Sequence, residues 1–258
     1  MARSGFRRRW RANRDWPMKK IGIVGGVAWL STVDYYSEIY RRSAPLTPEM
    51  SVESLDHNRA VSYLGVDGDE ESWVQFDEYH RAALQRLEAS GADFAMMASN
   101  SPHHRFESIV RDVGIPVIDI FEVVAKESAR IGAREVLILG TALTMRSPRF
   151  RETFARRGVA AAGPYDEAVK AMAVELSAEL QAGKRERAAE RLGKIVKGAI
   201  ERQFKTQPVV CLACTELPLA FPELKFAATF EQDGIVYINS TAVHINAAVD
   251  FATDGKAT

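Results

Sequence analysis

Two apolar segments of the chain end in side chains that differ greatly in acid–base strength. FAMMAS (94–99) ends at Ser99, and PVVCLAC (208–214) ends at Cys214. A free thiol titrates at about pH 8.5 and is a good base once ionised, whereas an alcohol is a very poor base at neutral pH. If the two segment ends meet in the fold, they predict a site with a base on one side and a weak proton donor on the other.

Hydrogen-bonding side chains follow these and other segment ends and suit the binding of carboxylates. The segment GTALTMRSPRF (140–150) combines hydroxyls with backbone N–H groups, and the guanidinium of Arg59 suits a second carboxylate through paired hydrogen bonds. The predicted substrate-binding residues are Asn100, Ser101, Thr141, Thr144, Thr215, Arg59 and Gly25. His103 and His244 are predicted to orient the catalytic groups or to transfer a proton.

Two short motifs admit other interpretations. GIVGG (22–26) continues with Val27 and Ala28, so it favours a tight turn or a backbone close to a small substrate over a nucleotide site. The C-x-x-C pair lacks nearby sulfur or histidine partners for zinc, and Cys211 lies inside an apolar run. We expect no metal, a buried Cys211, and a strand-end thiol at Cys214 whose pKa a following helix lowers.

Apolar runs alternate with helical patterns along the chain, which predicts an α/β fold with parallel sheets. Sites in such sheets lie at the carboxyl ends of strands, where this sequence concentrates Gly, Ser, Thr, Asn and Cys. Strands are expected at 19–26, 92–99, 134–141, 208–214 and 234–241, with a short strand running into a helix at 115–133. Helices are expected at 31–44, capped by Ser31 or Thr32, and at 71–91, 166–183, 186–202 and 244–252.

Composition and charge limit the classes of function. The 258 residues are 47% hydrophobic and 26% charged, and 34 Lys and Arg balance 34 Asp and Glu, which argues against a nucleic-acid or membrane-surface protein. Two cysteines and the lack of a long apolar run predict a cytoplasmic location and no membrane span. Residues 1–17 are basic without an apolar stretch, so we expect a disordered tail and no secretory signal.

Five motifs in this order resemble those of the aspartate/glutamate racemase superfamily, the cofactor-independent amino-acid racemases. IGIVGGVAWLSTVDYY is similar to the family's glycine strand and helix, and MASNSPHH to its first catalytic box, x-C-N-T-x-H. LGTALTMRS resembles G-T-x-x-T-x-x-S, and LACTELPL resembles the second box, G-C-T-E-L. NSTAVH resembles D-[ST]-T-x-x-H, with Asn239 in place of the acid, and the likeness spans about residues 19–252.

The resemblance implies two similar parallel-sheet α/β domains with the active site in the cleft between them. Residues 18–115 with 215–258 would form the first domain and 116–214 the second, and the protein would be a homodimer. Family members use two cysteines, one from each domain, to remove the α-proton from one face of an amino acid and to return a proton to the other. They need no pyridoxal phosphate, so no cofactor is expected.

One residue departs from the family pattern, because Ser99 stands in the place of the first cysteine. The resemblance then implies an isomerase that racemises L-aspartate or L-glutamate, with Cys214 as thiolate base and Ser99 or a water on the opposite face. Some relatives with threonine at this place favour one enantiomer. Two alternatives stay open: a cysteine-dependent decarboxylase or isomerase of a dicarboxylate, and an inactive or trapped protein that binds a small acid.

Overall fold

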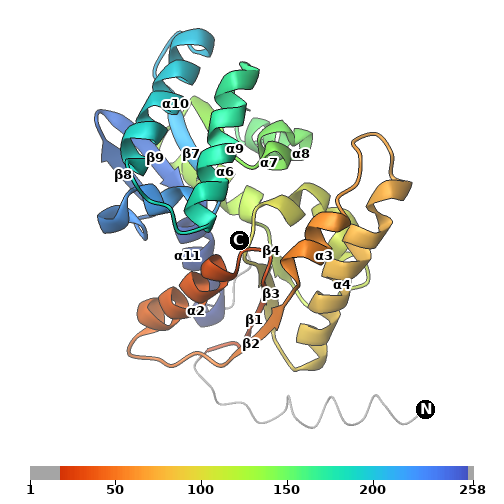
Figure 1. Cartoon of the computed structure of the whole chain (residues 1–258). Helices are drawn as coiled ribbons and strands as arrows, with labels where there is room; N and C mark the ends of the chain where they lie inside the picture. Colours follow the sequence, from red (N-terminus) through yellow and green to blue (C-terminus); the bar gives the residue numbers. More distant parts are fainter. Residues whose placement is uncertain (1–17, 255–258) are drawn as a thin grey trace, which may run out of the picture.

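The computed structural model describes residues 18–254, so the predicted disordered tail at 1–17 lies outside the described residues. Strands and helices alternate and form two separate sheets, one in each half of the molecule (Figure 1). The predicted α/β class with two parallel-sheet units is confirmed. Between residues 18 and 254, no helix has both the length and the hydrophobicity that crossing a bilayer requires.

The first sheet contains four parallel strands in the order β2-β1-β3-β4. They are β1 (Ile21–Gly25), β2 (Met50–Ser54), β3 (Phe94–Met97) and β4 (Val117–Ile118). Every residue of β1 and β3 is buried, which explains why these central strands are uninterrupted apolar runs. The helices of this unit are α2 (Trp29–Ser43), α3 (His57–Ser62), α4 (Val74–Ala89) and α5 (Phe106–Val110).

The second sheet contains five strands in the order β6-β5-β7-β9-β8, and only the pair β8 and β9 is antiparallel. They are β5 (Glu135–Gly140), β6 (Ala160–Ala162), β7 (Val209–Ala213), β8 (Thr229–Gln232) and β9 (Ile235–Asn239). The helices are α6 (Ile120–Arg130), α7 (Ala142–Arg146), α8 (Pro148–Ala155), α9 (Glu167–Gln181) and α10 (Ala188–Gln203). Leu176 of α9 and Ile195 of α10 share a core with Leu137 of β5.

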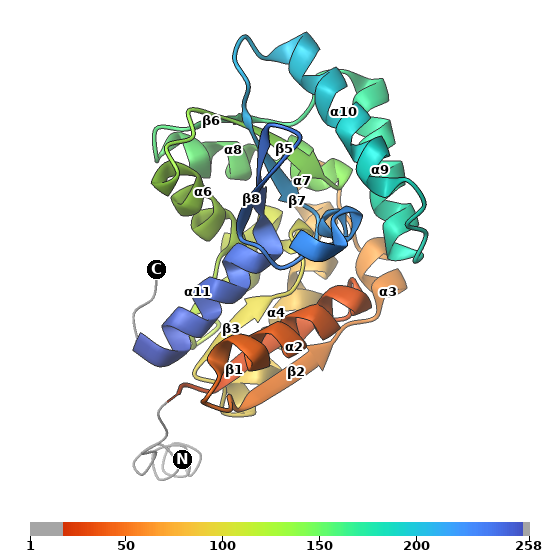
Figure 2. The same ribbon diagram turned by 90° about the vertical axis from the view of Figure 1, so that its left-hand side faces the viewer.

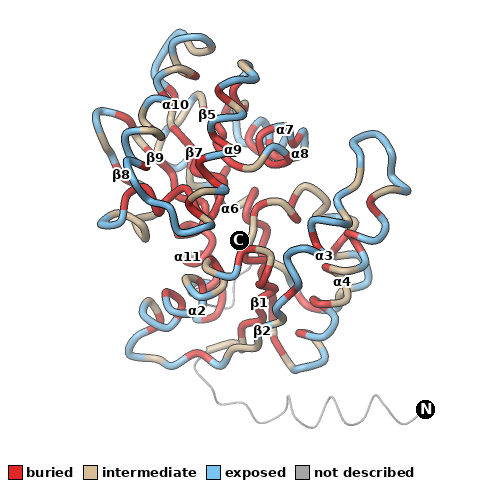
Figure 3. The backbone as a smooth tube through the Cα atoms, viewed as in Figure 1, coloured by how far each residue is buried: buried red, intermediate tan, exposed pale blue. Residues whose placement is uncertain are grey.

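The last helix, α11 (Ser240–Asp254), joins the two units. It packs against α2 of the first and α6 of the second, and Figure 2 shows it running from the second sheet down beside α2. Its residues Ile245 and Ala248 share one core with Ile21 of β1 and Ile238 of β9. Figure 3 shows buried backbone along the strands of both sheets, so a continuous core fixes the two sets of strand ends relative to each other.

The observed sheet membership differs from the division predicted by the sequence. The resemblance implies that 116–214 form the second unit and that 215–258 return to the first, but β4 pairs with β3, and β9 pairs with β7. The apolar run of β9 finds its buried neighbour in β7, and only α11 returns to the first unit. Helix α2 begins at Trp29, with Ala28 as N-cap, which leaves the side chain of Ser31 free for another role.

Several elements have no clear signal in the sequence. Strand β2 is exposed at alternate positions, and β6 has only three residues, so neither forms a recognisable apolar run. Helices α3 and α8, with 6 and 8 residues, are shorter than the window of about 11 residues over which helical periodicity is recognised. None of these elements is expected from the sequence, and β2 and β6 lie at the edges of their sheets.

Histidine burial predicts a pH-dependent stability. Burial lowers the pKa of His80 to about 4, so between pH 6.5 and 4 the unfolded chain binds a proton that the folded chain does not. Folding stability is therefore lost as the pH falls through this window. His80→Phe should reduce the loss of unfolding free energy between pH 7 and 5 by about 2 kcal/mol, measured by urea denaturation. An unchanged pH dependence in the variant would contradict this assignment.

Candidate active site

A cavity of about 330 Å³ lies between the two units, where the carboxyl ends of β1 and β3 face those of β5 and β7. Parallel α/β sheets bind ligands at this end of their strands. The polar side chains that line the cavity include six predicted from the sequence: Ser99, Asn100, Ser101, Thr141, Cys214 and Thr215. The folding of two distant strand ends toward one space therefore brings these residues together.

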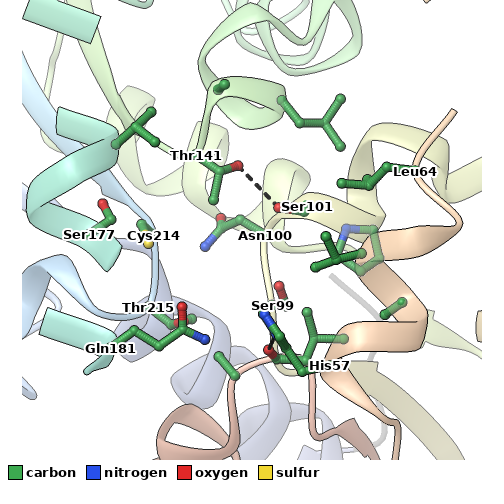
Figure 4. A pocket seen from close by; sticks show the side chains of 18 of the residues that line it. His57, Leu64, Ser99, Asn100, Ser101, Thr141, Ser177, Gln181, Cys214 and Thr215 are labelled. Carbon is green, nitrogen blue, oxygen red and sulfur yellow. Dashed lines mark hydrogen bonds between the residues drawn. The ribbon is translucent and has the colours of Figure 1, made fainter. Parts of the chain in front are cut away.

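Ser99 and Cys214 come from different units. Figure 4 shows Ser99 toward one side of the cavity and Cys214 toward the other, with Asn100 between them. The Oγ atom of Ser101 lies 3.1 Å from Oγ1 of Thr141, so a direct hydrogen bond connects the two units at the cavity wall. A ligand at this place contacts both sheets.

Cys214 is buried beside a carboxylate that accepts a hydrogen bond from its thiol. Its Sγ donates to Oε2 of Glu216 at 3.0 Å, and the hydroxyl of Thr215 donates to the same oxygen at 2.9 Å. The other oxygen, Oε1, accepts from the hydroxyl of Ser31 in α2 at 3.1 Å. Glu216 is itself buried, and no cation pairs with it in the described part of the chain. Three hydrogen bonds thus hold a buried carboxylate next to the thiol.

The thiol is neutral in the ligand-free protein. Burial raises the pKa of Cys214 well above its ordinary value, and the negative charge of Glu216 raises it further. This corrects the expectation that a helix N-terminus lowers this pKa. The residues that follow form only a short 3-10 turn, Leu217–Ala220, and the nearest charge is negative.

Asn100 is buried at the cavity wall with one amide atom unpaired. Its Nδ2 donates to Oγ of Ser240 at 3.1 Å, and Ser240 gives its only hydroxyl proton to the carbonyl oxygen of Leu212 at 2.8 Å. This chain of bonds fixes the orientation of the amide. It leaves Oδ1 without a partner among residues 18–254. Because an unpaired buried acceptor is unfavourable, Oδ1 suits a donor on a ligand.

Of the two predicted threonines after β5, only Thr141 lines the cavity. Its Oγ1 caps α7 by accepting from the backbone N–H of Thr144 at 3.3 Å, and it lies 3.0 Å from Oγ1 of Thr144. Thr144 is fully buried behind Thr141. Thr144 is thus placed to orient the hydroxyl of Thr141 rather than to line the cavity itself.

The two histidines predicted to act on the substrate lie in the core and do not line the cavity. Nδ1 of His103 is 2.9 Å from Oδ1 of Asp119, and His244 lies between the hydroxyl of Tyr35 at 3.0 Å and the carbonyl of Ile118 at 3.1 Å. Burial lowers the pKa of His244 to about 3, so the ring is neutral. These histidines stabilise the contact between the units, and the structure places neither ring on the cavity lining.

Arg59 and Gly25 also lie away from the cavity lining. Arg59 is exposed, its Nε donates to the hydroxyl of Tyr63 at 2.9 Å, and its guanidinium lies over the ring of Tyr79. A Cβ on Gly25 would come within 2.4 Å of Thr32, so this glycine permits close packing of β1 on α2. The structure therefore gives each residue a packing contact and places neither at the cavity.

Other lining residues were not identified from the sequence. His57, in α3, has Nδ1 2.6 Å from the carbonyl oxygen of Val27, and Figure 4 shows it on the same side as Ser99. Ser177 and Gln181 reach the cavity from α9, where a spacing of four residues places them on one face. No motif marks these positions, because their role depends on how distant helices meet the strand ends.

The described residues offer no metal site. Between positions 18 and 254, no group of three or more His, Cys, Asp or Glu side chains is arranged to hold a metal ion. Cys211 is fully buried inside β7, so the C-x-x-C pair has only one thiol at the cavity. Two α/β units with a thiol–carboxylate pair at their shared cleft define a protein suited to acid–base chemistry on a small molecule.

Comparison with known proteins agrees with this class. Residues 24–248 match the Asp/Glu/hydantoin racemase family, and the chain belongs to this family of amino-acid racemases, which are isomerases. An aspartate racemase homologue from Pyrococcus horikoshii is 27% identical, with a TM-score of 0.70 over 92% of this chain and 100% of that chain. A putative Asp/Glu racemase from Yersinia pestis shares the fold at 21% identity, with a TM-score of 0.73 over 91% and 99% of the two chains.

A substitution at Gly25 distinguishes a role in packing β1 on α2 from a role in substrate binding. Gly25→Ala should lower the free energy of unfolding by about 1–3 kcal/mol, because the new Cβ overlaps Thr32. Adding Thr32→Ala should cost less than the sum of the two single changes, as expected for groups in contact. Denaturant unfolding measures both effects. A Gly25→Ala protein of normal stability with weaker ligand binding would instead support a substrate contact.

Proposed function

We propose that the protein is a cofactor-independent amino-acid racemase in which Cys214 and Ser99 act on opposite faces of the α-carbon. Cys214, as the thiolate, removes the α-proton of the L-enantiomer, and Ser99 or a water that it positions delivers a proton to the other face. The observation that supports this most directly is a single cavity thiol with its own proton acceptor, across the cavity from a hydroxyl. Inversion at carbon requires groups on two sides.

Proton transfer from Cys214 to Glu216 supplies the base. The hydrogen bond of 3.0 Å is the path, and the transfer moves one negative charge within the pair instead of creating a second. The raised pKa of the thiol makes its thiolate a stronger base toward the weakly acidic α-C–H bond. After Cys214 has taken the α-proton, Glu216 returns its own proton to solvent, and solvent restores the proton that left the opposite face.

The α-amino acid core has matching groups on the cavity wall. The hydroxyls of Ser101 and Thr141 suit the α-carboxylate, and donors held there stabilise the charge that moves onto it when the α-proton leaves. The unpaired Oδ1 of Asn100 suits the ammonium group. A positive ammonium close to the sulfur of Cys214 also favours the thiolate over the thiol.

The resemblance points to aspartate or glutamate as substrate, and similar solved structures described as an aspartate racemase and as glutamate racemases support a trial of both. Support from a side-chain carboxylate site is weaker, because Arg59 is exposed and bound to Tyr63. The groups around Cys214 therefore account for the α-carbon chemistry. The rest of the cavity wall determines whether the site prefers a charged or an uncharged substrate side chain.

A one-base reaction on a dicarboxylate is the second candidate. The single cavity thiol favours it, since Cys214 could protonate the enolate that remains when a carboxylate leaves as carbon dioxide, and solvent would then reprotonate the thiolate. Release of carbon dioxide from a malonate-type acid, without α-proton exchange of any amino acid, would favour this candidate over racemisation.

Proton NMR in D₂O tests the proposal. Loss of the α-proton signal of an L-amino acid should occur with the wild-type protein and should fall at least about 100-fold in Cys214→Ala. Cys211→Ala, in which the buried thiol of β7 is removed, is the matched control and should retain exchange. Chiral chromatography follows formation of the D-enantiomer in parallel. Equal exchange in wild type and Cys214→Ala would contradict the assignment of the base.

Glu216→Gln distinguishes two effects of the carboxylate, which raises the pKa of Cys214 and also accepts the thiol proton in the proposed reaction. Removal of its charge should lower the pKa of Cys214, so iodoacetamide should alkylate the thiol faster, while α-proton exchange falls about 100-fold because the proton acceptor is lost. Ser31→Ala removes one donor to Oε1 but keeps the carboxylate and Oε2, so exchange should fall less than in Glu216→Gln. Slower alkylation, or exchange at the wild-type rate, would be evidence against the relay.

A further inference from the structure

Beyond the strand ends, one wall of the cavity is apolar. Its side chains come from α3, the connection after it and the start of α4, namely Val61, Leu64, Trp73 and Phe76. Trp73 and Phe76 are almost fully buried and pack edge to face, with ring centroids 5.5 Å apart. Figure 4 shows Leu64 on this side of the cavity, away from Cys214. The wall is therefore a fixed aromatic and aliphatic surface.

The second unit extends this surface. Leu143 of α7 is buried and lines the cavity, and Val174 and Ala178 of α9 line it as well. Because α7 follows the β5 end that carries Thr141, the apolar surface begins directly beside the hydroxyls that suit the α-carboxylate. A substrate held by these hydroxyls can extend its side chain along apolar groups from both units.

The charged groups on the lining do not suit a second carboxylate. Within the described chain, the Asp, Glu, Lys and Arg side chains that line the cavity are Arg146 and Glu216. Arg146 is exposed, and its Nε lies 2.7 Å from Oδ2 of Asp67, so its charge is solvated and already paired. Glu216 is negative and buried. The Nδ1 atom of His57 is bonded to a backbone carbonyl.

We propose that the preferred substrate is an α-amino acid with an uncharged, mainly apolar side chain, which lies against Val61, Leu64, Trp73 and Phe76. This inference rests on the proposed function and names its substrate class. An apolar side chain gains stability by leaving water at this wall, whereas a carboxylate would be desolvated there with its only neighbouring cation already paired. A thioether or branched aliphatic chain also suits contact with an indole ring.

Pairs of amino acids with equal shape and different charge test the inference. Glutamate is compared with glutamine and aspartate with asparagine, and L-methionine and L-leucine serve as apolar substrates in α-proton exchange by NMR in D₂O. We expect kcat/KM for methionine or leucine at least tenfold above that for glutamate, and each amide above its acid. Glutamate or aspartate exchanging as fast as its amide, or faster than methionine, would overturn the inference.

Calorimetric titration of the same six amino acids distinguishes the two proposals. Tighter binding of methionine than of glutamate without any α-proton exchange would support the ligand class and reject the racemase. Exchange that favours the acids would support the racemase and reject the ligand class. If none of the six binds and none exchanges, the inference is overturned together with the proposed function.

Leu64→Lys, with Val66→Lys as control, tests the wall directly. Leu64 lines the cavity, whereas Val66 is more exposed and is not part of the lining. Leu64→Lys should lower kcat/KM for methionine at least tenfold and raise that for glutamate, because a cation replaces an apolar contact. Val66→Lys should change neither value. The same effect from both substitutions would show that charge alone, and not the cavity wall, decides the preference.

Discussion

The hydrogen-bonded but unpaired carboxylate of Glu216 determines the chemistry available at this cleft. It is buried, so its charge depends on donors from Cys214, Thr215 and Ser31. The same charge raises the pKa of the thiol and provides the acceptor through which the thiol can still lose its proton. Because Ser31 belongs to α2 and Cys214 follows β7, this carboxylate also connects the two units at the cavity.

The difference in acid–base strength between the two sides of the cavity is a second constraint on the reaction. Cys214 has a hydrogen-bonded carboxylate that can accept its proton. Ser99 is an alcohol, and among the described contacts no side chain is hydrogen-bonded to it. His57 lies toward the same side of the cavity as Ser99. A thiolate on one face and a hydroxyl on the other predict easy removal of the α-proton and slow return to the opposite face. The two faces of the substrate therefore differ in rate, and exchange should exceed inversion.

The sequence predicts the strand ends well and the distant walls poorly. Ser99, Asn100, Thr141 and Cys214 were identified because parallel strands deliver their last residues to one edge, and the family motifs mark the same places. The direction of His103 could not be predicted, since a histidine after a strand gives no indication of whether its ring turns to the cavity or to Asp119. The apolar wall had no signal, because short helices and α9 reach the cavity only through tertiary packing. The pKa of the thiol likewise depends on burial, which spacing alone does not reveal.

The most direct test of the asymmetric pair is the ratio of D-enantiomer formation to α-proton exchange in Ser99→Cys, measured in D₂O with the L-amino acid that exchanges fastest. A thiol is a far better acid than an alcohol, so this ratio should rise at least about tenfold over wild type while exchange at the Cys214 face continues. A ratio that stays at the wild-type value, with exchange intact, would contradict the claim that residue 99 governs proton return to the opposite face.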